Sequence, residues 1–337
     1  MKKLFITIFV ALCMHANGDV LQLRENHPQR YVVVKGDTLW DISAKFLKSP
    51  WKWPDIWATN QYIENPHLIY PGDVLVLVYR DGVPQLILER NQVVKLSPNI
   101  REGEVDNAIP ALALDVIRPF LSNNTILTNE HDVMGSPYVV AGNEGRIISG
   151  AGDIVFAKGR FDDSRRFNIY RKGQVFVDPE TAEVLGYEML YIGTSNRTAF
   201  QGDIATLAVI KTAEEIRLGD HVLPNAEAEI IASYYPKSPA SVVNGRILAV
   251  EDGVTQIGLH SIVMINKGTR EGIALGDVLA VQRQGNTVKD PYTHELIQLP
   301  PVRGGIVMIV KTFDKLSYGL VMESTQPLEV GDGVINP

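Results

Sequence analysis

Cysteine is almost absent from this chain, which has a single one, Cys13, among 337 residues. Cys13 lies in an N-terminal segment that we expect to be removed, so the mature chain would have no disulfide, thiol nucleophile or thiolate metal ligand. Histidine is also scarce, and no two of the seven histidines have a His-x-His or HExxH spacing. The sequence therefore predicts no metal site and no cofactor.

The chain also has no block of basic residues and no long apolar run. Its 32 lysines and arginines are outnumbered by 39 acidic residues, which gives a net charge of −7. A negative chain without a basic patch is not expected to bind nucleic acid or anionic lipid. No stretch reaches the roughly 18 apolar residues that a transmembrane helix needs.

The N-terminus has the layout of a secretory signal peptide. Two lysines are followed by the apolar run from Leu4 to Met14 and then by small residues at 16–18. We expect residues 1–18 to be removed, with cleavage two residues earlier as the open alternative. The residue before the cysteine is the bulky Leu12, so we expect no lipid attachment. These features predict export to the periplasm.

Residues 30–79 are predicted to form a small α+β module of about 50 residues with a βααβ order. The predicted elements are strand 31–34, a helix opened by Thr38 and Asp41, a helix opened by Pro54 and Asp55, and strand 74–78. Trp51 and Trp53 lie between the helices. They are expected either to close the small core or to expose one indole as a platform for a sugar ring.

This module resembles the LysM family, through VKGDTLWDIS at one end and NPHLIYPGDVL at the other. The resemblance implies binding of N-acetylglucosamine-containing glycans of peptidoglycan in a shallow groove between two walls. An uncharged N-acetyl sugar needs backbone donors and acceptors and an apolar surface. The implied glycan-binding residues are Gly36, Asp37, Thr38 and Leu39 on one wall and Pro66, Leu68, Ile69 and Tyr70 on the other.

The segment 80–165 is predicted to be a linker followed by a small mixed or β domain. Asp81-Gly82 and Pro84 suggest a hinge after the module. Pro110 and Pro119 bracket a candidate short helix. The following stretch has frequent glycines, as in strands joined by tight turns.

An internal repeat begins near residue 166. Residues 171–185 match 283–297 at an offset of 112, which also relates Asp178-Pro179 to Asp290-Pro291. Both copies alternate β-rich runs with Gly-Asp and Asp-Pro turns. We therefore predict mainly-β domains, small barrels or sandwiches, at 166–224 and 240–337.

Four sequence motifs after the module resemble the type IV pilus secretin-associated (TsaP) family. They are AIPALALDVIRPFLS, PYVVAG, RIISGAGD and the paired DPxTxE motifs. The resemblance implies a protein associated with peptidoglycan and the outer membrane, with an outer-membrane secretin ring as partner. It leaves open a ring-shaped oligomer around the secretin. Another secretion or flagellar ring is the alternative partner.

The sequence predicts no catalytic residue. Ser195 lacks the glycine pattern of a nucleophile elbow, and Glu323-Ser324 ends a β-rich run instead of lying on a helix. The acidic pairs Glu214-Glu215 and Asp162-Asp163 are expected to be solvated. A cell-wall hydrolase with an unrecognised acidic site remains the alternative from another functional class.

Overall fold

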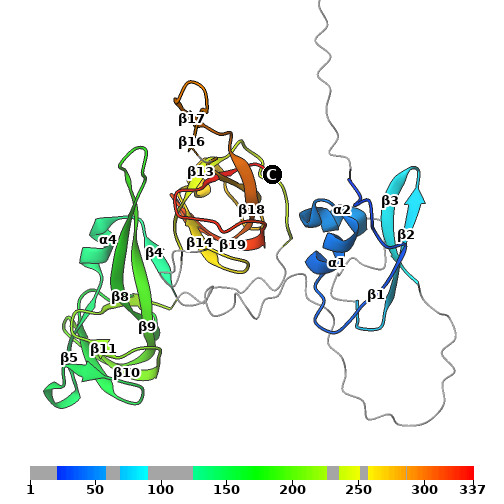
Figure 1. The fold of residues 1–337 in the computed structure, drawn as a ribbon. Helices are drawn as coiled ribbons and strands as arrows, with labels where there is room; N and C mark the ends of the chain where they lie inside the picture. The colour runs from blue at the N-terminus through cyan, green and yellow to red at the C-terminus, as the bar shows by residue number, and fades with distance from the viewer. Residues whose placement is uncertain (1–20, 58–68, 90–123, 226–234, 251–256, 286) are drawn as a thin grey trace, which may run out of the picture. The chain divides into compact units, whose positions relative to one another are not determined.

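A computed structural model describes residues 21–57, 69–89, 124–225, 235–250, 257–285 and 287–337 (Figure 1). The expected signal peptide and the helix expected between Pro110 and Pro119 lie outside the described residues. The chain separates into two compact units, Met1–Ile109 and Pro110–Pro337. No helix among the described residues is long and apolar enough to cross a membrane.

The first unit combines short helices with a three-stranded antiparallel sheet in the order β1-β2-β3. Its elements are β1 (Arg30–Val32), α1 (Leu39–Phe46), η1 (Pro50–Lys52), α2 (Trp53–Trp57), β2 (Val74–Arg80) and β3 (Val83–Leu88). α1 begins as predicted, because Thr38 is its N-cap and accepts a hydrogen bond from the backbone N–H of Asp41.

Aromatic side chains fill the core of this small unit. Trp40, Trp51, Trp53 and Trp57 are all buried, together with the apolar face of α1. A unit of this size has little room for aliphatic layers, so large indoles supply much of its buried area. Of the two roles considered for Trp51 and Trp53, the structure therefore places both indoles in the core.

The hinge predicted at residues 81–84 is wrong, because the chain forms a hairpin there. Asp81 and Gly82 both have positive φ, 50° and 80°, and Pro84 lies in β3 opposite Tyr79. Two left-handed residues give a tight turn whose twist matches that of the flanking strands. The Asp-Gly pair between alternating strands was the available signal. The sheet of the first unit therefore extends to Leu88.

The second unit begins with a sheet in the order β10-β7-β5-β12-β8-β9-β4, in which β10 also pairs with β9. Its elements are β4 (Thr125–Leu127), α4 (Glu130–Gly135), β5 (Tyr138–Gly142), η3 (Asn143–Gly145), β6 (Ile148–Ser149), β7 (Ile154–Lys158), β8 (Arg166–Val177), β9 (Val184–Gln201), β10 (Ile204–Thr212), β11 (Ile216–Arg217) and β12 (His221–Pro224). The β10–β9 pairing closes six strands on themselves, and we call this the first barrel.

The boundary expected at residues 165 and 166 falls inside the first barrel. β5 and β7 precede that boundary, yet they lie between β10 and β12 in the same sheet. The strands after residue 166 cannot close a barrel without them, because β10 and β12 need partners on their second edges.

A second closed barrel follows, in the order β13-β14-β19-β18-β15-β20. Its elements are β13 (Asn244–Val250), β14 (Ile262–Ile265), η5 (Thr269–Glu271), β15 (Val278–Arg283), β16 (Thr287–Lys289), β17 (Leu296–Gln298), β18 (Val302–Thr312), β19 (Ser317–Ser324) and β20 (Gly333–Ile335). Its six strands pair as β5, β7, β10, β9, β8 and β12 do in the first barrel. Each barrel encloses its own apolar core. The body of the chain is thus mostly β.

Candidate functional site

The first wall of the expected groove is a four-residue turn, Val34 to Asp37. Gly36 has a φ of 97°, and the Asp37 N–H donates to the Val34 carbonyl at 3.1 Å. The Asp37 carboxylate accepts from the Val34 N–H at 2.9 Å and from the Tyr31 hydroxyl at 2.8 Å. This carboxylate therefore holds the turn together and is already engaged within the protein.

The Tyr31 hydroxyl is held in its protonated form beside this turn. Burial and then the hydrogen bond to Asp37 raise the pKa of Tyr31 to about 12. The Lys45 ammonium lies over the same ring, 5.1 Å from its centroid. The Tyr31 hydroxyl thus acts as a hydrogen-bond donor that orients the Asp37 carboxylate.

The next two residues of this wall face inward. Thr38 is buried, accepts from the Asp41 N–H at 3.1 Å and donates to the Asp41 carboxylate at 2.7 Å. Leu39 is fully buried in the core. Of the four expected contact residues of this wall, Gly36 is exposed and Asp37 is half-buried, and Val34 and Lys35 beside them are exposed as well.

The second wall is built by the same kind of turn, Tyr70 to Asp73. The Tyr70 N–H donates to the Asp73 carboxylate at 2.9 Å, and Gly72 has a φ of 93°. Ile69 is fully buried, whereas Tyr70 is 40% exposed. Pro66 and Leu68 lie outside the described residues. Among the expected contact residues of this wall that are described, only Tyr70 offers its side chain to a ligand.

Main-chain hydrogen bonds join the two walls. The Gly72 N–H donates to the Val33 carbonyl and the Val33 N–H donates to the Asp73 carbonyl, both at 2.8 Å. Val33 precedes the first turn directly, so the spacing of the walls is set by backbone geometry. The exposed Gly36 in one turn and the partly exposed Tyr70 ring in the other are the kinds of group that a neutral sugar needs.

Residues 31–78 match the LysM domain family. The match includes both walls of the LysM domain and all eight expected contact residues. LysM is a peptidoglycan-binding domain, so this part of the chain indicates association with the cell wall. The predicted order of a LysM domain followed by a mostly-β body is confirmed.

One similar protein is described as "Uncharacterized protein YqbP" of Bacillus subtilis (strain 168). It is 41% identical to this chain over 58 residues, which cover 14% of this chain and 26% of that protein. The chain thus spans about a quarter of the length of this relative. The similarity therefore concerns a small part of either chain.

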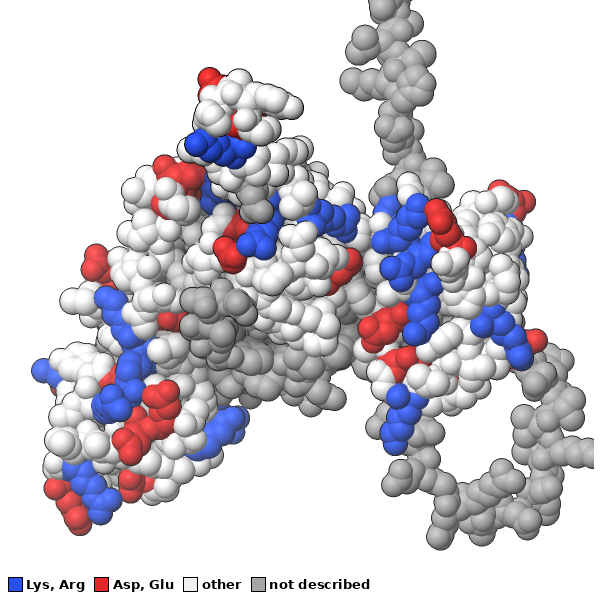
Figure 2. All heavy atoms as spheres, viewed as in Figure 1, with Lys and Arg blue, Asp and Glu red and all other residues white. Residues whose placement is uncertain are grey.

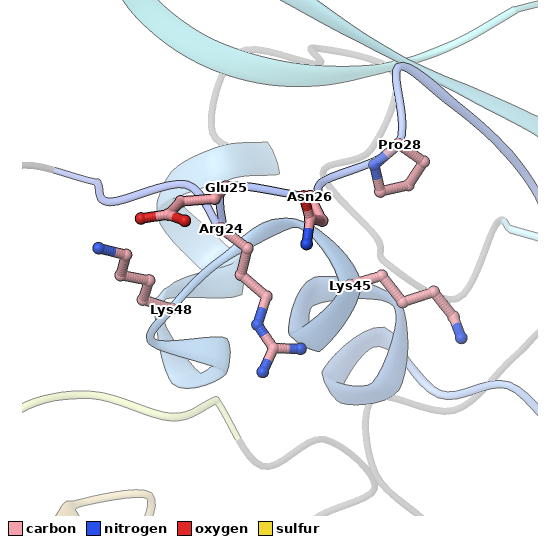
Figure 3. A pocket seen from close by; sticks show the side chains of 6 residues that line it. All are labelled: Arg24, Glu25, Asn26, Pro28, Lys45 and Lys48. Carbon is pink, nitrogen blue, oxygen red and sulfur yellow. The ribbon is translucent and has the colours of Figure 1, made fainter.

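A basic hollow on the first unit was missed by sequence reasoning. It is open and is lined by Arg24, Glu25, Asn26, Pro28, Lys45 and Lys48 (Figure 3). The Arg24 guanidinium donates to the Ala44 carbonyl at 2.8 Å, which fixes the N-terminal segment against α1. Figure 2 shows basic side chains gathered along this unit. Only the fold brings residues 24–28 beside α1.

A serine and a histidine of the first barrel form another arrangement that the sequence did not indicate. Ser136 Oγ and His221 Nδ1 lie 2.7 Å apart, and Ser136 Oγ donates to the Val133 carbonyl at 2.7 Å. Burial lowers the pKa of His221 below its usual range. Asp220 pairs with Arg171 at 2.9 Å. The serine proton is thus directed to the end of α4, as in a structural cap.

Three of the acidic and serine candidates considered from the sequence, Glu214, Asp162 and Ser195, have structural partners. Glu214 pairs with Arg171 at 3.0 Å, and Asp162 accepts from the Ser164 N–H at 3.0 Å. Ser195 is fully buried and donates to the Phe167 carbonyl at 3.4 Å. Within the described ranges, no group of three or more His, Cys, Asp and Glu side chains could hold a metal ion.

Proposed function

We propose that this chain is a non-enzymatic tether of the bacterial envelope. Its LysM domain holds peptidoglycan, and its barrels hold an outer-membrane ring, the secretin of a type IV pilus. The observation that carries the proposal is the LysM match at 31–78, which includes the turns at Val34 to Asp37 and Tyr70 to Asp73. Such a tether would spread the load of pilus extension and retraction into the cell wall.

The glycan contact in this proposal lies between the exposed backbone at Gly36 and the ring of Tyr70. The backbone would bond the N-acetyl amide, and the tyrosine ring would cover a sugar face. Thr38, Leu39 and Ile69 would support the two turns from the core without touching the glycan, since all three side chains are buried. Asp37 acts by holding its turn in shape.

The ring-binding part of the proposal rests on the barrels and on the resemblance to the TsaP family. We infer that the two barrels are copies of one unit. Their strands pair in the same order, and β8 and β15 begin 112 residues apart, at 166 and 278. A tandem pair of similar barrels offers repeated surfaces to a repeated ring. Several LysM domains around the ring would act together through high effective concentration.

Export to the periplasm and the absence of catalysis are part of the same proposal. The signal-peptide layout of residues 1–18 supports export. The structural roles of Ser136, Ser195 and Glu214 support a binding protein rather than a hydrolase. Zymography with purified sacculi tests this point, and a cleared zone would establish the hydrolase alternative.

Sedimentation of the full-length mature chain with purified sacculi tests the glycan site. We expect Tyr70→Ala to reduce cosedimentation severalfold, while Tyr79→Ala is the matched control. Tyr79 is 59% exposed and lies in β2 beside the far hairpin turn. Ile69→Asp is unsuitable, because a carboxylate in this fully buried position would unfold the domain. Equal binding by both tyrosine variants would move the glycan site elsewhere.

Crosslinking in cells tests the protein partner. The full-length chain should crosslink to the secretin, and a chain lacking residues 30–89 should still do so while losing its binding to sacculi. Crosslinks to a different ring would establish the rival in which the same tether serves another secretion or flagellar machine. If no outer-membrane ring is captured, peptidoglycan binding alone remains.

A further inference from the structure

The basic hollow of the first unit forms where the N-terminal segment pairs with the end of α1. The Lys48 N–H donates to the Gln22 carbonyl at 2.9 Å, and the Arg24 N–H donates to the Phe46 carbonyl at 2.8 Å. An isolated antiparallel bridge lies between these two bonds. Main-chain bonds therefore fix the positions from which the lining side chains extend (Figure 3).

The Arg24 guanidinium anchors this segment and keeps donors for a ligand. One N–H donates to the Ala44 carbonyl at 2.8 Å, at the end of α1, where carbonyls lack partners within the helix. A guanidinium has five N–H donors in a planar fork. Since this is the side-chain bond that Arg24 makes among the described residues, its other donors are available. A carboxylate can accept two parallel bonds from such a fork.

Lys45 and Lys48 add two exposed cations to the hollow. Neither ammonium pairs with a carboxylate in the part of the chain that the structure describes. Glu25 is the acidic side chain of the lining, so three positive charges face one negative charge, an excess of two. In Figure 3 the Arg24 guanidinium lies between the side chains of the two lysines. The hollow thus suits a ligand with more carboxylates than amines.

Stabilisation of α1 explains only part of this lining. Lys45 and Lys48 lie at its C-terminal end, where the helix dipole favours cations. The same dipole disfavours a carboxylate, yet Glu25 lines the same hollow. Glu25 also disfavours an inorganic phosphate, which is anionic throughout and has no amine to pair with it. A ligand that carries both kinds of charge fits the whole lining.

The hollow borders the first turn of the proposed glycan site through Lys45. Its ammonium lies 5.1 Å from the centroid of the Tyr31 ring, and the Tyr31 hydroxyl donates to the Asp37 carboxylate at 2.8 Å. Asp37 ends the turn that begins at Val34. The width of one tyrosine side chain therefore separates the hollow from that turn. A peptide branch of about four residues spans roughly 13 Å when extended, so it would reach from the turn into the hollow.

We propose that the hollow binds the peptide stem of peptidoglycan, while the two turns of the glycan site hold a sugar of the same strand. This inference deepens the proposed function and rests on its glycan site. The stem branches from every second sugar and carries several carboxylates and, where it is not crosslinked, a free amine. Arg24, Lys45 and Lys48 would bind the carboxylates, and Glu25 would accept a hydrogen bond from the amine.

Such a hollow would make the domain selective for strands that carry peptides. Charged side chains at an open surface give modest affinity and are screened by salt. The gain in affinity over a plain N-acetylglucosamine polymer should therefore be severalfold at low ionic strength and should shrink as salt is added. The sugar contact, made by backbone groups and a tyrosine ring, should change little with salt.

Binding of the full-length mature chain to two polymers tests the proposal. Intact sacculi carry stems, whereas chitin is an uncharged polymer of N-acetylglucosamine without them. Lys48→Glu should lower the affinity for sacculi about fivefold, because a repulsion replaces an exposed attraction. It should leave binding to chitin unchanged.

Arg80→Glu is the matched control, because Arg80 is exposed at the far end of β2. Circular dichroism checks that both variants are folded, and Lys48→Gln, with an expected loss of about twofold, replaces the reversal if that variant unfolds. Equal binding of sacculi by Lys48→Glu and Arg80→Glu would overturn the proposal. An equal loss of chitin binding in Lys48→Glu would overturn it as well.

The free stem tetrapeptide tests the hollow without any sugar. Titration of the chain with this peptide should shift the NMR signals of the Arg24 side chain, and Lys48→Glu should weaken the binding about fivefold. The same peptide with amidated carboxylates should not bind. Displacement of the peptide by an equal concentration of inorganic phosphate would indicate a general anion site and overturn the assignment to the stem.

These measurements separate the hollow from the proposed function. Tyr70→Ala should weaken binding to both polymers and leave binding of the free tetrapeptide unchanged. If the tetrapeptide binds but Tyr70→Ala has no effect on chitin, the hollow is supported and the glycan site fails. If Tyr70→Ala weakens binding to both polymers but the tetrapeptide does not bind, the glycan site stands and the hollow is overturned.

Discussion

The LysM domain and the barrels use the same four-residue turn in different surroundings. In each turn, glycine has a positive φ and an aspartate carboxylate accepts the N–H three residues earlier. Such turns end at Asp37, Asp73, Asp153, Asp220, Asp277 and Asp332. In the LysM domain the aspartates are half-buried and the turns border the proposed glycan site, whereas the last three are buried in the barrels. The Gly-Asp dipeptide therefore indicates this turn, and whether the turn contributes to the core or lies at the surface depends on its surroundings.

The largest effect should follow from replacing Asp220, the barrel turn aspartate that pairs with a partly buried arginine. Asp220 accepts from the Arg217 N–H at 2.8 Å and pairs with the partly buried Arg171 at 2.9 Å. Asp220→Ala leaves Arg171 without this partner and should lower the free energy of unfolding by about 4 kcal/mol. Urea unfolding measures this, with the half-buried Asp153→Ala as control. Equal losses would remove the distinction between the two surroundings.

The glycines of two barrel turns should separate conformational strain from crowding. Gly276 and Gly331 have φ values of 84° and 98°. A Cβ at Gly276 would overlap the Tyr235 carbonyl oxygen, whereas a Cβ at Gly331 meets nothing within 4 Å. We expect Gly276→Ala to cost about 3 kcal/mol and Gly331→Ala about 1 kcal/mol, measured by thermal unfolding. If the two costs agree, strain at φ alone explains both.

In the LysM domain the same aspartate should matter for binding as well as for stability. Asp73→Ala removes the acceptor of the Tyr70 N–H and should cost about 1 kcal/mol. Because Tyr70 then moves more freely, cosedimentation with sacculi should fall although the domain stays folded. Asp55→Ala, at an exposed position of α2, is the control for loss of a carboxylate. Unchanged binding with a loosened turn would show that the second wall does not need to be rigid.

The smallest effect concerns the tip of the β8–β9 hairpin, residues 178–183, which docks on the second barrel through Glu183. We expect this docking to depend on pH. The pKa of Glu183 is lowered to about 2 by Arg270 and Lys315, against an ordinary value of 4.5. A lowered pKa means that the docked state binds fewer protons, so docking is favoured above about pH 4.5 and weakens as the pH falls toward 2. Glu183→Gln should flatten this dependence, which NMR of the Arg270 side chain can follow across the window. A curve that is the same in the variant would assign the dependence to other groups.

Local patterns were sufficient for part of the fold and for locating the LysM domain. Thr38 with Asp41 predicted where α1 begins, and the two motif ends both lie within the matched residues 31–78. The inward direction of Leu39 and Ile69 could not be predicted, because apolar residues of a small domain serve the core before they serve a ligand. Sequence letters alone do not distinguish the two roles.

Long-range pairing accounts for most of what the sequence did not show. β5 and β7 pair with each other, but their other partners, β12 and β10, lie after residue 165. The repeat detected from residue 166 onward therefore marks only part of the first barrel. The surface of the second barrel that contacts the β8–β9 hairpin tip combines Arg246, Asn266 and Lys315, which lie far apart along the chain. The periodicity of the sequence cannot predict such a surface, because the order of the strands in the barrel brings its residues together.

The hairpin that replaces the predicted hinge determines how the LysM domain would respond to mechanical load. Leu88, at the end of β3, pairs with Leu75 at the beginning of β2, directly after the groove turn at Tyr70 to Asp73. In the proposed tether, a bound glycan and a pull transmitted along the chain would therefore act at the same end of one strand pair. The bonds between β2 and β3 would be loaded one after another from Leu88 toward Gly82, as in a zipper. Under rising force β3 would peel away first, which lengthens the connection and relieves tension before the groove turns are disturbed.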